Sequence, residues 1–209
     1  MDKNLLSLDL RTVEGIRYLS AHFYPRRYME RWKEIGSLSL EMASQVQGYS
    51  LQQYKEEIEH FSFFESYFPD SLKEVELPDS YISFFDKLME DFRSGELQRV
   101  ITRFHLVTEG ILADLGLTIL NDSSRRLGLK EFNDGIKRII ADEARHFKFG
   151  LSLISDKSYA VKRVEEIFPE AMRIVMDGKE KLSYLGYEEE KLRDMMEKLR
   201  KARVNQLLT

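Results

Sequence analysis

The sequence predicts an all-α fold, and three of its features support that prediction. Apolar residues recur at helical spacing through most of the 209 residues, and no stretch alternates in the manner of a β-strand. Only four prolines and eleven glycines interrupt this pattern. An apolar content of 43% is sufficient for one sizeable core, so we expect a single domain over residues 1–209.

Four long helices are expected to form two helix hairpins, with shorter helices between and after them. Pro25 should kink the first helix, because a proline ring removes a helical hydrogen bond. The bundle would occupy residues 8–155, and packing helices would occupy 158–209. The last helix is amphipathic, so we expect it either to pack on the bundle or to pair with a second copy in a homodimer. The expected helices cover residues 8–33, 38–68, 81–92, 95–122, 131–155, 159–176 and 188–207.

The composition excludes several classes of function. The net charge of −4 arises from acidic and basic residues that are mixed along the chain, which predicts no nucleic-acid partner. The absence of cysteine excludes disulfides, thiolate zinc sites and iron–sulfur clusters. No apolar run is long enough for a membrane span or a signal peptide, so we expect a cytoplasmic protein.

Two Glu-x-x-His motifs are the main candidates for a functional site. They are "EIEH", with Glu57 and His60, and "EARH", with Glu143 and His146. Residues three or four apart lie on one face of a helix, and in both motifs that face is otherwise apolar. A buried carboxylate is unfavourable unless its charge is compensated. The two motifs therefore predict a polar group inside the bundle.

Glu109 is the candidate for a third carboxylate in this group. It lies among apolar residues in "LVTEGILADLGL". Glu109 and Glu143 are equidistant from residue 126, which falls in the predicted turn of the second hairpin. Residues equidistant from a hairpin turn face each other at the same height, so these two glutamates should meet.

Two glutamates of the first helix are candidates for a fourth carboxylate. Glu14 and Glu57 are equidistant from the predicted turn beside Gly36. Glu30 does not pass that test, and several basic residues surround it at helical spacing, which is typical of a solvated face. We therefore favour Glu14, with Glu30 as the alternative.

These side chains together predict a dinuclear metal site. A Glu-x-x-His motif on each of two helices, with one glutamate on each of two others, is the ligand pattern of di-iron helical bundles. Oxygen-rich ligation with one imidazole per metal suits iron or manganese. We expect two metal ions per chain, either Fe/Fe or Mn/Fe. The expected ligands are Glu14, Glu57, His60, Glu109, Glu143 and His146.

The strings "VTEGILADLG" and "DEARHFKFG" resemble the ferritin-like di-iron carboxylate superfamily. Within it they are most similar to the ribonucleotide reductase small subunits and their ligand-binding oxidase relatives, and more loosely to the aldehyde-deformylating oxygenases. The resemblance implies a ferritin-like four-helix bundle with the six ligands above. It also implies that Asp142 supports a ligand histidine through the second ring nitrogen, and Glu56 occupies the equivalent place before Glu57.

The chain departs from these relatives at three positions. Phe64 stands where the reductase subunits have a radical tyrosine, which excludes a stable tyrosyl radical there. Arg17 and Phe104 stand where the ligand-binding oxidases join a valine to a tyrosine, so that crosslink cannot form.

Further residues are expected around the metals. His105, four residues before Glu109, would be a hydrogen-bonded core histidine, which we favour, or a seventh metal ligand or a donor to the metal ligands. Helical spacing predicts a substrate pocket lined by Phe61, Phe64, Phe104 and Leu112.

The expected function is oxidation of an apolar small molecule with dioxygen, with electrons from an external donor. A non-catalytic metal protein for iron handling or peroxide scavenging is the alternative. A helical interaction protein without metal is the third possibility, and it would be fully stable in chelator.

Overall fold

The computed structural model describes residues 5–23, 49–69 and 74–209, and these residues form helices and connecting turns without any strand. The all-α prediction is therefore confirmed. The elements are η1 (Leu5–Ser7), α1 (Leu10–His22), α3 (Tyr49–Tyr67), α4 (Asp79–Arg93), α5 (Leu97–Ile101), η3 (Thr102–Ala113), α6 (Asp114–Arg126), α7 (Lys130–Ser152), α8 (Lys157–Asp177), α9 (Lys179–Ser183) and α10 (Glu189–Leu208).

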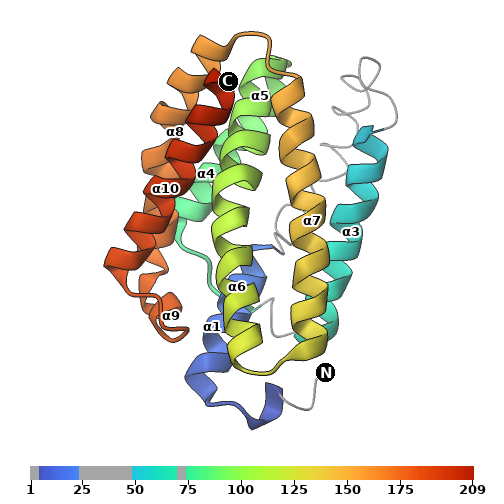
Figure 1. The fold of residues 1–209 in the computed structure, drawn as a ribbon, viewed down its shortest axis with the longest axis vertical. Helices are drawn as coiled ribbons and strands as arrows, with labels where there is room; N and C mark the ends of the chain where they lie inside the picture. The colour runs from blue at the N-terminus through green and yellow to red at the C-terminus, as the bar shows by residue number, and fades with distance from the viewer. Residues whose placement is uncertain (1–4, 24–48, 70–73) are drawn as a thin grey trace.

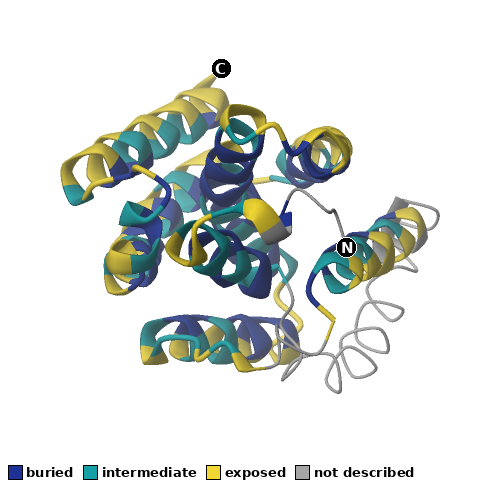
Figure 2. Ribbon diagram, turned by 90° about the horizontal axis from the view of Figure 1, so that it is seen from below, coloured by how far each residue is buried: buried dark blue, intermediate teal, exposed yellow. Residues whose placement is uncertain are grey.

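The helices are arranged as a bundle around one long central helix (Figure 1). This central helix is continuous through α5, η3 and α6. On one side α7 packs against it, and α3 packs against α7. On the other side lie α8 and α10, with α4 against α8. The helices turn their exposed faces outward and their buried faces toward one another (Figure 2).

The hairpin between α6 and α7 has the turn that the sequence predicts. Gly128 lies between the two helices with a φ of +69°, a left-handed conformation that favours glycine. Asn133, in the first turn of α7, closes the hairpin because its side-chain amide donates to the Asn121 carbonyl at 2.8 Å and to Ser124 Oγ at 2.9 Å. This turn places η3 and α7 side by side.

An aromatic cluster joins α3 to α7 at the turn end of the bundle. Phe132 of α7 is fully buried, and its ring lies 5.4 Å from that of Phe63 and 4.9 Å from that of Tyr67. Phe64, also fully buried, stacks on Phe23 at 5.3 Å. These contacts fix the height of α3 relative to α7, and therefore the relative height of the two Glu-x-x-His motifs.

The segment η3 is a π-helix over twelve residues. In a π-helix the backbone bonds join residues five apart, and such segments are frequent at functional sites. The side chain of Thr108 adds a bond over the same interval, because its hydroxyl donates to the Arg103 carbonyl at 2.9 Å. Glu109 lies inside this segment, so its direction is set by a wider helical turn than the sequence pattern assumes.

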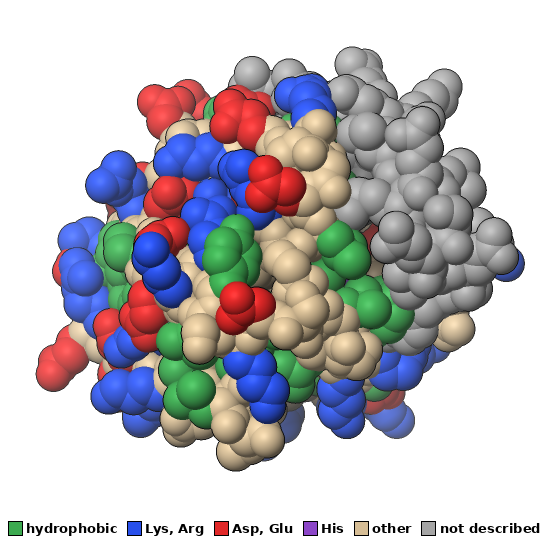
Figure 3. All heavy atoms as spheres, turned by 90° about the horizontal axis from the view of Figure 1, so that it is seen from above, with side chains coloured by type: hydrophobic (Ala, Val, Ile, Leu, Met, Phe, Trp, Pro, Cys, Tyr) green, Lys and Arg blue, Asp and Glu red, His purple; other side chains and the backbone are tan. Residues whose placement is uncertain are grey.

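The last helix packs on the bundle, which is one of the two outcomes expected for it. It contacts α8 and η3. Arg203 donates to the Gly110 carbonyl at 2.6 Å and pairs with Asp114. Acidic and basic side chains are interspersed on the face seen in Figure 3, in agreement with the mixed charge pattern of the sequence.

Two features of the N-terminal and C-terminal parts bear on the predictions. The first expected helix is described only as α1, and Pro25, the turn beside Gly36 and Glu30 lie outside the described residues. The short helix α9 was not expected, and it packs against α1.

No helix in the described ranges has both the length and the apolar character needed to cross a membrane.

Candidate metal centre

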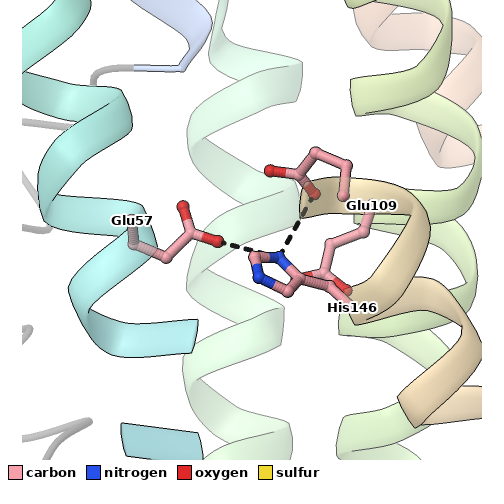
Figure 4. Close-up of side chains that lie close together, drawn as sticks. Glu57, Glu109 and His146 are labelled. Atoms are coloured by element: carbon pink, nitrogen blue, oxygen red, sulfur yellow. Dashed lines mark ion pairs between the residues drawn. The ribbon is translucent and has the colours of Figure 1, made fainter. Parts of the chain in front are cut away.

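Four titratable side chains from three helices converge inside the bundle (Figure 4). They are Glu57 of α3, Glu109 of η3, and Glu143 and His146 of α7. One potential ligand atom from each lies within 4.8 Å of every other. The structure therefore brings together four of the six predicted ligands as a group that can hold a metal ion.

His60 of α3 adjoins this group. Its Nδ1 atom lies 3.7 Å from Glu57 Oε2 and 3.5 Å from Glu143 Oε1. The Nδ1 atom of His146 lies 3.5 Å from Glu57 Oε1. Both histidines thus turn the same ring nitrogen toward the glutamates, and five of the predicted ligands lie together.

The outer nitrogen of each histidine is held by an acid from the opposite helix. His60 Nε2 lies 3.1 Å from Asp142 Oδ2, and His146 Nε2 lies 2.8 Å from Glu56 Oε2. Arg145 Nη2 joins the two acids at 2.6 Å each. A carboxylate on one ring nitrogen keeps the proton there and leaves the other nitrogen free to bind a metal. The predicted placement of Asp142 and Glu56 beside the histidines is met in this geometry.

Glu109 has two partners of a different kind. The side-chain amide of Gln53 donates to Glu109 Oε1 at 2.6 Å, and His105 Nδ1 lies 2.6 Å from Glu109 Oε2. His105 therefore makes the hydrogen bond expected of it. Gln53 was missed in the sequence, although it lies four residues before Glu57 and so on the same face of α3.

The ionisation of the group reflects both burial and mutual charge. Burial alone would lower the pKa of His60, but its interactions with Glu143 and Glu57 raise it to about 11. The same opposition raises the pKa of His146 to about 9. Burial would raise the pKa of Glu143, but the two histidines lower it to about 2. For Glu57 and Glu109 burial prevails, the charge of Glu143 adds to it, and each pKa is raised. Bound protons thus balance the acids, and metal cations would displace them.

These residues fit a pair of divalent or trivalent cations. Three carboxylates and two imidazoles form an oxygen-rich donor set of the type that iron and manganese prefer. Glu143 Oε2 is buried, and no hydrogen bond from the described residues reaches it. A buried acceptor without a hydrogen bond is unfavourable, and a cation would satisfy it.

Glu14 is not part of this group, which corrects the preferred assignment for the first helix. Its carboxylate lies 2.6 Å from Arg17 and 3.4 Å from Lys181 of α9. Leu10, one helical turn before Glu14, is 85% exposed, so the face of α1 that carries Glu14 is not a core face at that turn. Glu30, the alternative, lies outside the described residues.

The structure agrees with only part of the predicted lining of the substrate pocket. Phe64 is fully buried in the aromatic cluster, and Phe104 packs edge-on against Phe92 and His105. Phe61 is partly buried against the core. Leu112 lines an apolar cavity.

That cavity, of about 110 Å³, lies between α1, α4, the central helix, α8 and α9, and its walls are almost entirely apolar. Tyr18, His22 and Thr108 are its main polar lining residues. Burial lowers the pKa of His22 to about 4, against the opposing hydrogen bond to the Tyr18 carbonyl, so the ring is neutral.

Together, the fold and the site define a ferritin-like helical bundle with an internal carboxylate–imidazole group. The solved structures that share this fold include R2-like ligand-binding oxidases. One with an aerobically reconstituted Mn/Fe cofactor superposes with a TM-score of 0.78 at 18% identity, over 98% of this chain and 87% of its own. Another, with an anaerobically reconstituted Mn/Fe cofactor, also has a TM-score of 0.78 at 18% identity, over 98% of this chain and 83% of its own.

The resemblance inferred from the sequence motifs is therefore confirmed at the level of the fold. No protein-family model and no curated protein matches the chain.

Proposed function

We propose that this protein is a dinuclear-metal oxidoreductase that uses dioxygen to oxidise a small apolar molecule. The observation that carries the proposal is a reciprocal pair of contacts between α3 and α7. Asp142 of α7 orients His60 of α3, and Glu56 of α3 orients His146 of α7. If the glutamates had clustered by chance, there would be no reason for both histidines to turn Nδ1 toward them. The Mn/Fe cofactors of the structural neighbours add support for a metal pair.

The residues that would hold the metals are Glu57, His60, Glu109, Glu143 and His146. Iron or manganese ions bound there would supply the redox chemistry that dioxygen reduction requires. Side chains and helices around the ligands have supporting roles. Asp142 and Glu56 keep the protons on the outer nitrogens, and the surrounding helices bury Glu109, Glu143 and His146.

The cavity beside the central helix supports an apolar small-molecule substrate. Thr108 and Leu112, which flank Glu109 in η3, form part of its wall. An apolar cavity of ~150 Å³ accepts benzene, so the smaller cavity of about 110 Å³ suits a short aliphatic molecule. The electrons would come from an external donor.

A single-turnover experiment tests this function. The protein is loaded anaerobically with Fe(II), or with Mn(II) and Fe(II), in the presence of propane or butane, and then exposed to dioxygen. The proposal predicts oxygen consumption and hydroxylated or dehydrogenated product, and neither in a Glu143→Ala variant. Metal uptake and oxygen consumption with no oxidised product from either probe would contradict the oxidation of small apolar molecules and favour the non-catalytic alternative.

A further inference from the structure

Glu109 is held differently from the two other glutamates of the cluster. Its Oε1 receives a hydrogen bond from Gln53 and its Oε2 lies against His105, both at 2.6 Å. All three side chains are buried, with exposed fractions of 4% for Glu109 and 7% for each of the other two. Both oxygens of this carboxylate are therefore engaged by protein groups inside the bundle.

The direction of the two contacts distinguishes the oxygens. Oε1 is the oxygen that lies 3.7 Å from His146 Nδ1, on the side of the other ligands. Oε2 is occupied by His105. An ionised carboxylate accepts hydrogen bonds only, so Gln53 and His105 must be the donors when Glu109 binds a cation. Each carboxylate oxygen has two lone-pair directions, so Oε1 can accept from Gln53 and still face a metal.

The fold fixes the ring of His105 in this place. The ring belongs to η3, four residues before Glu109, and the wide turn of a π-helix brings residues at that separation nearly into line. Gly150 of α7 leaves room for it, because a Cβ there would lie 2.2 Å from His105 Cβ. The imidazole is thus confined between two helices, with Phe104 and Phe149 edge-on at 5.0 and 5.9 Å.

We propose that Gln53 and His105 are positioning residues that clamp Glu109 and keep its Oε1 turned toward the other ligands. This inference rests on the proposed function and deepens it. It makes the site asymmetric: both oxygens of Glu109 contact residues outside the ligand set, whereas the contacts of Glu57 and Glu143 described above are with the two ligand histidines.

The test compares anaerobic Mn(II) binding, by calorimetry and by electron paramagnetic resonance, in the unmodified protein and in three variants. His105→Phe removes the donor and keeps an aromatic ring. His105→Asn keeps an N–H donor near the place of Nδ1. Loss of a partner that orients a metal ligand typically weakens metal binding about 10- to 100-fold, so His105→Phe should do so and alter the Mn(II) resonance. His105→Asn should restore most of both.

The third variant, Gly150→Ala, removes neither a donor nor a ligand, but its Cβ would displace the ring of His105. It should weaken Mn(II) binding in the same direction as His105→Phe. His22→Phe is the matched control, because it deletes a buried neutral imidazole outside the cluster and should leave Mn(II) affinity unchanged. Thermal unfolding of each metal-free variant establishes that it is folded.

The outcomes separate this inference from the function on which it rests. An unmodified protein that binds no Mn(II) contradicts the metal centre and the clamp together. An unmodified protein that binds Mn(II), with His105→Phe equal to it in affinity and resonance, overturns the clamp alone. Equal losses in His105→Phe and His105→Asn, in proportion to their loss of thermal stability, would also overturn it, because only structural support would then remain.

Discussion

The glutamates of two regions are neutralised in different ways. One region is the contact between α3 and α7, which we call the seam, and the other is the region around α1. At the seam, each Glu-x-x-His motif receives its supporting acid from the other helix, and the arrangement is reciprocal. On α1, Glu14 is satisfied by Arg17 of its own helix and by Lys181 of α9. A carboxylate within reach of two cationic side chains is neutralised by them, whereas the carboxylates gathered inside the bundle are balanced by bound protons that metal cations could displace.

The difference shows what to look for in a sequence. The partners of the seam glutamates are encoded as a repeated pattern of an acid, a glutamate and a histidine. One of the two partners of Glu14, Lys181, comes from a helix of five residues in another part of the chain, and no local pattern predicts that contact. Breaking each region separately therefore tests the comparison.

The largest effect is expected from Phe132→Ala, which empties the aromatic contact between α7 and α3. Phe132 is fully buried against Phe63 and Tyr67, and truncation of such a residue costs about 3–5 kcal/mol of folding stability. Urea denaturation measures the change. Leu10→Ala on α1 is the control, because Leu10 is 85% exposed and should change stability by less than about 0.5 kcal/mol. Equal effects of the two substitutions would contradict the assignment of the seam as core.

The reciprocal acids come next. Glu56→Gln and Asp142→Asn each leave one histidine without its carboxylate, and each should weaken metal affinity about 10- to 100-fold. Competition with a chelator of known affinity measures this loss. Because the two acids play equivalent parts, similar losses are expected. A loss in one variant and none in the other would disprove the reciprocity.

His22 predicts a pH effect confined to the α1 side. Its pKa is lowered from 6.5 to about 4 by burial, so the unfolded chain binds a proton that the folded chain does not. The stability contribution is present above pH 6.5 and is lost as the pH falls toward 4. Between pH 7 and pH 5 the loss from this group is about 2 kcal/mol. Denaturation of His22→Phe should accordingly show a flatter pH dependence over that interval, and an unchanged dependence would rule out a buried neutral ring.

The smallest effect is expected from Glu14→Gln. A half-exposed ion pair contributes little, so stability should change by less than about 1 kcal/mol. Metal content should not change at all, because Glu14 lies outside the cluster. Loss of a metal ion in this variant, measured by elemental analysis, would restore Glu14 as a ligand and contradict the structure.

Much of the site was predictable because hairpin symmetry and helical spacing act together. The turn at Gly128 lies where the pairing of Glu109 with Glu143 requires it, and the two come together. The same symmetry argument misplaced Glu14, because hairpin symmetry predicts the height of a residue and not the partners it meets, and the carboxylate of Glu14 pairs with Arg17 and Lys181.

Other features had no readable signal. The π-helical turn of η3 depends on backbone geometry, which residue spacing does not encode. The aromatic residues predicted to line a pocket are used for packing instead, as with Phe64, because a stripe of aromatic residues looks the same in both roles. Gln53 was overlooked because an amide carries no charge to compensate, although its place on the face of Glu57 was available.

The most direct test of the central claim is the metal content of the purified protein after anaerobic loading with Fe(II) or Mn(II), with Glu143→Ala as the control. Glu143 contacts both histidines and contributes to the ligand group, so its removal should destroy the site. The account predicts about two metal ions per chain in the unmodified protein and loss of them in the variant. Less than about one tenth of a metal ion per chain after loading would contradict it, because the glutamates and histidines would then be balanced by protons alone.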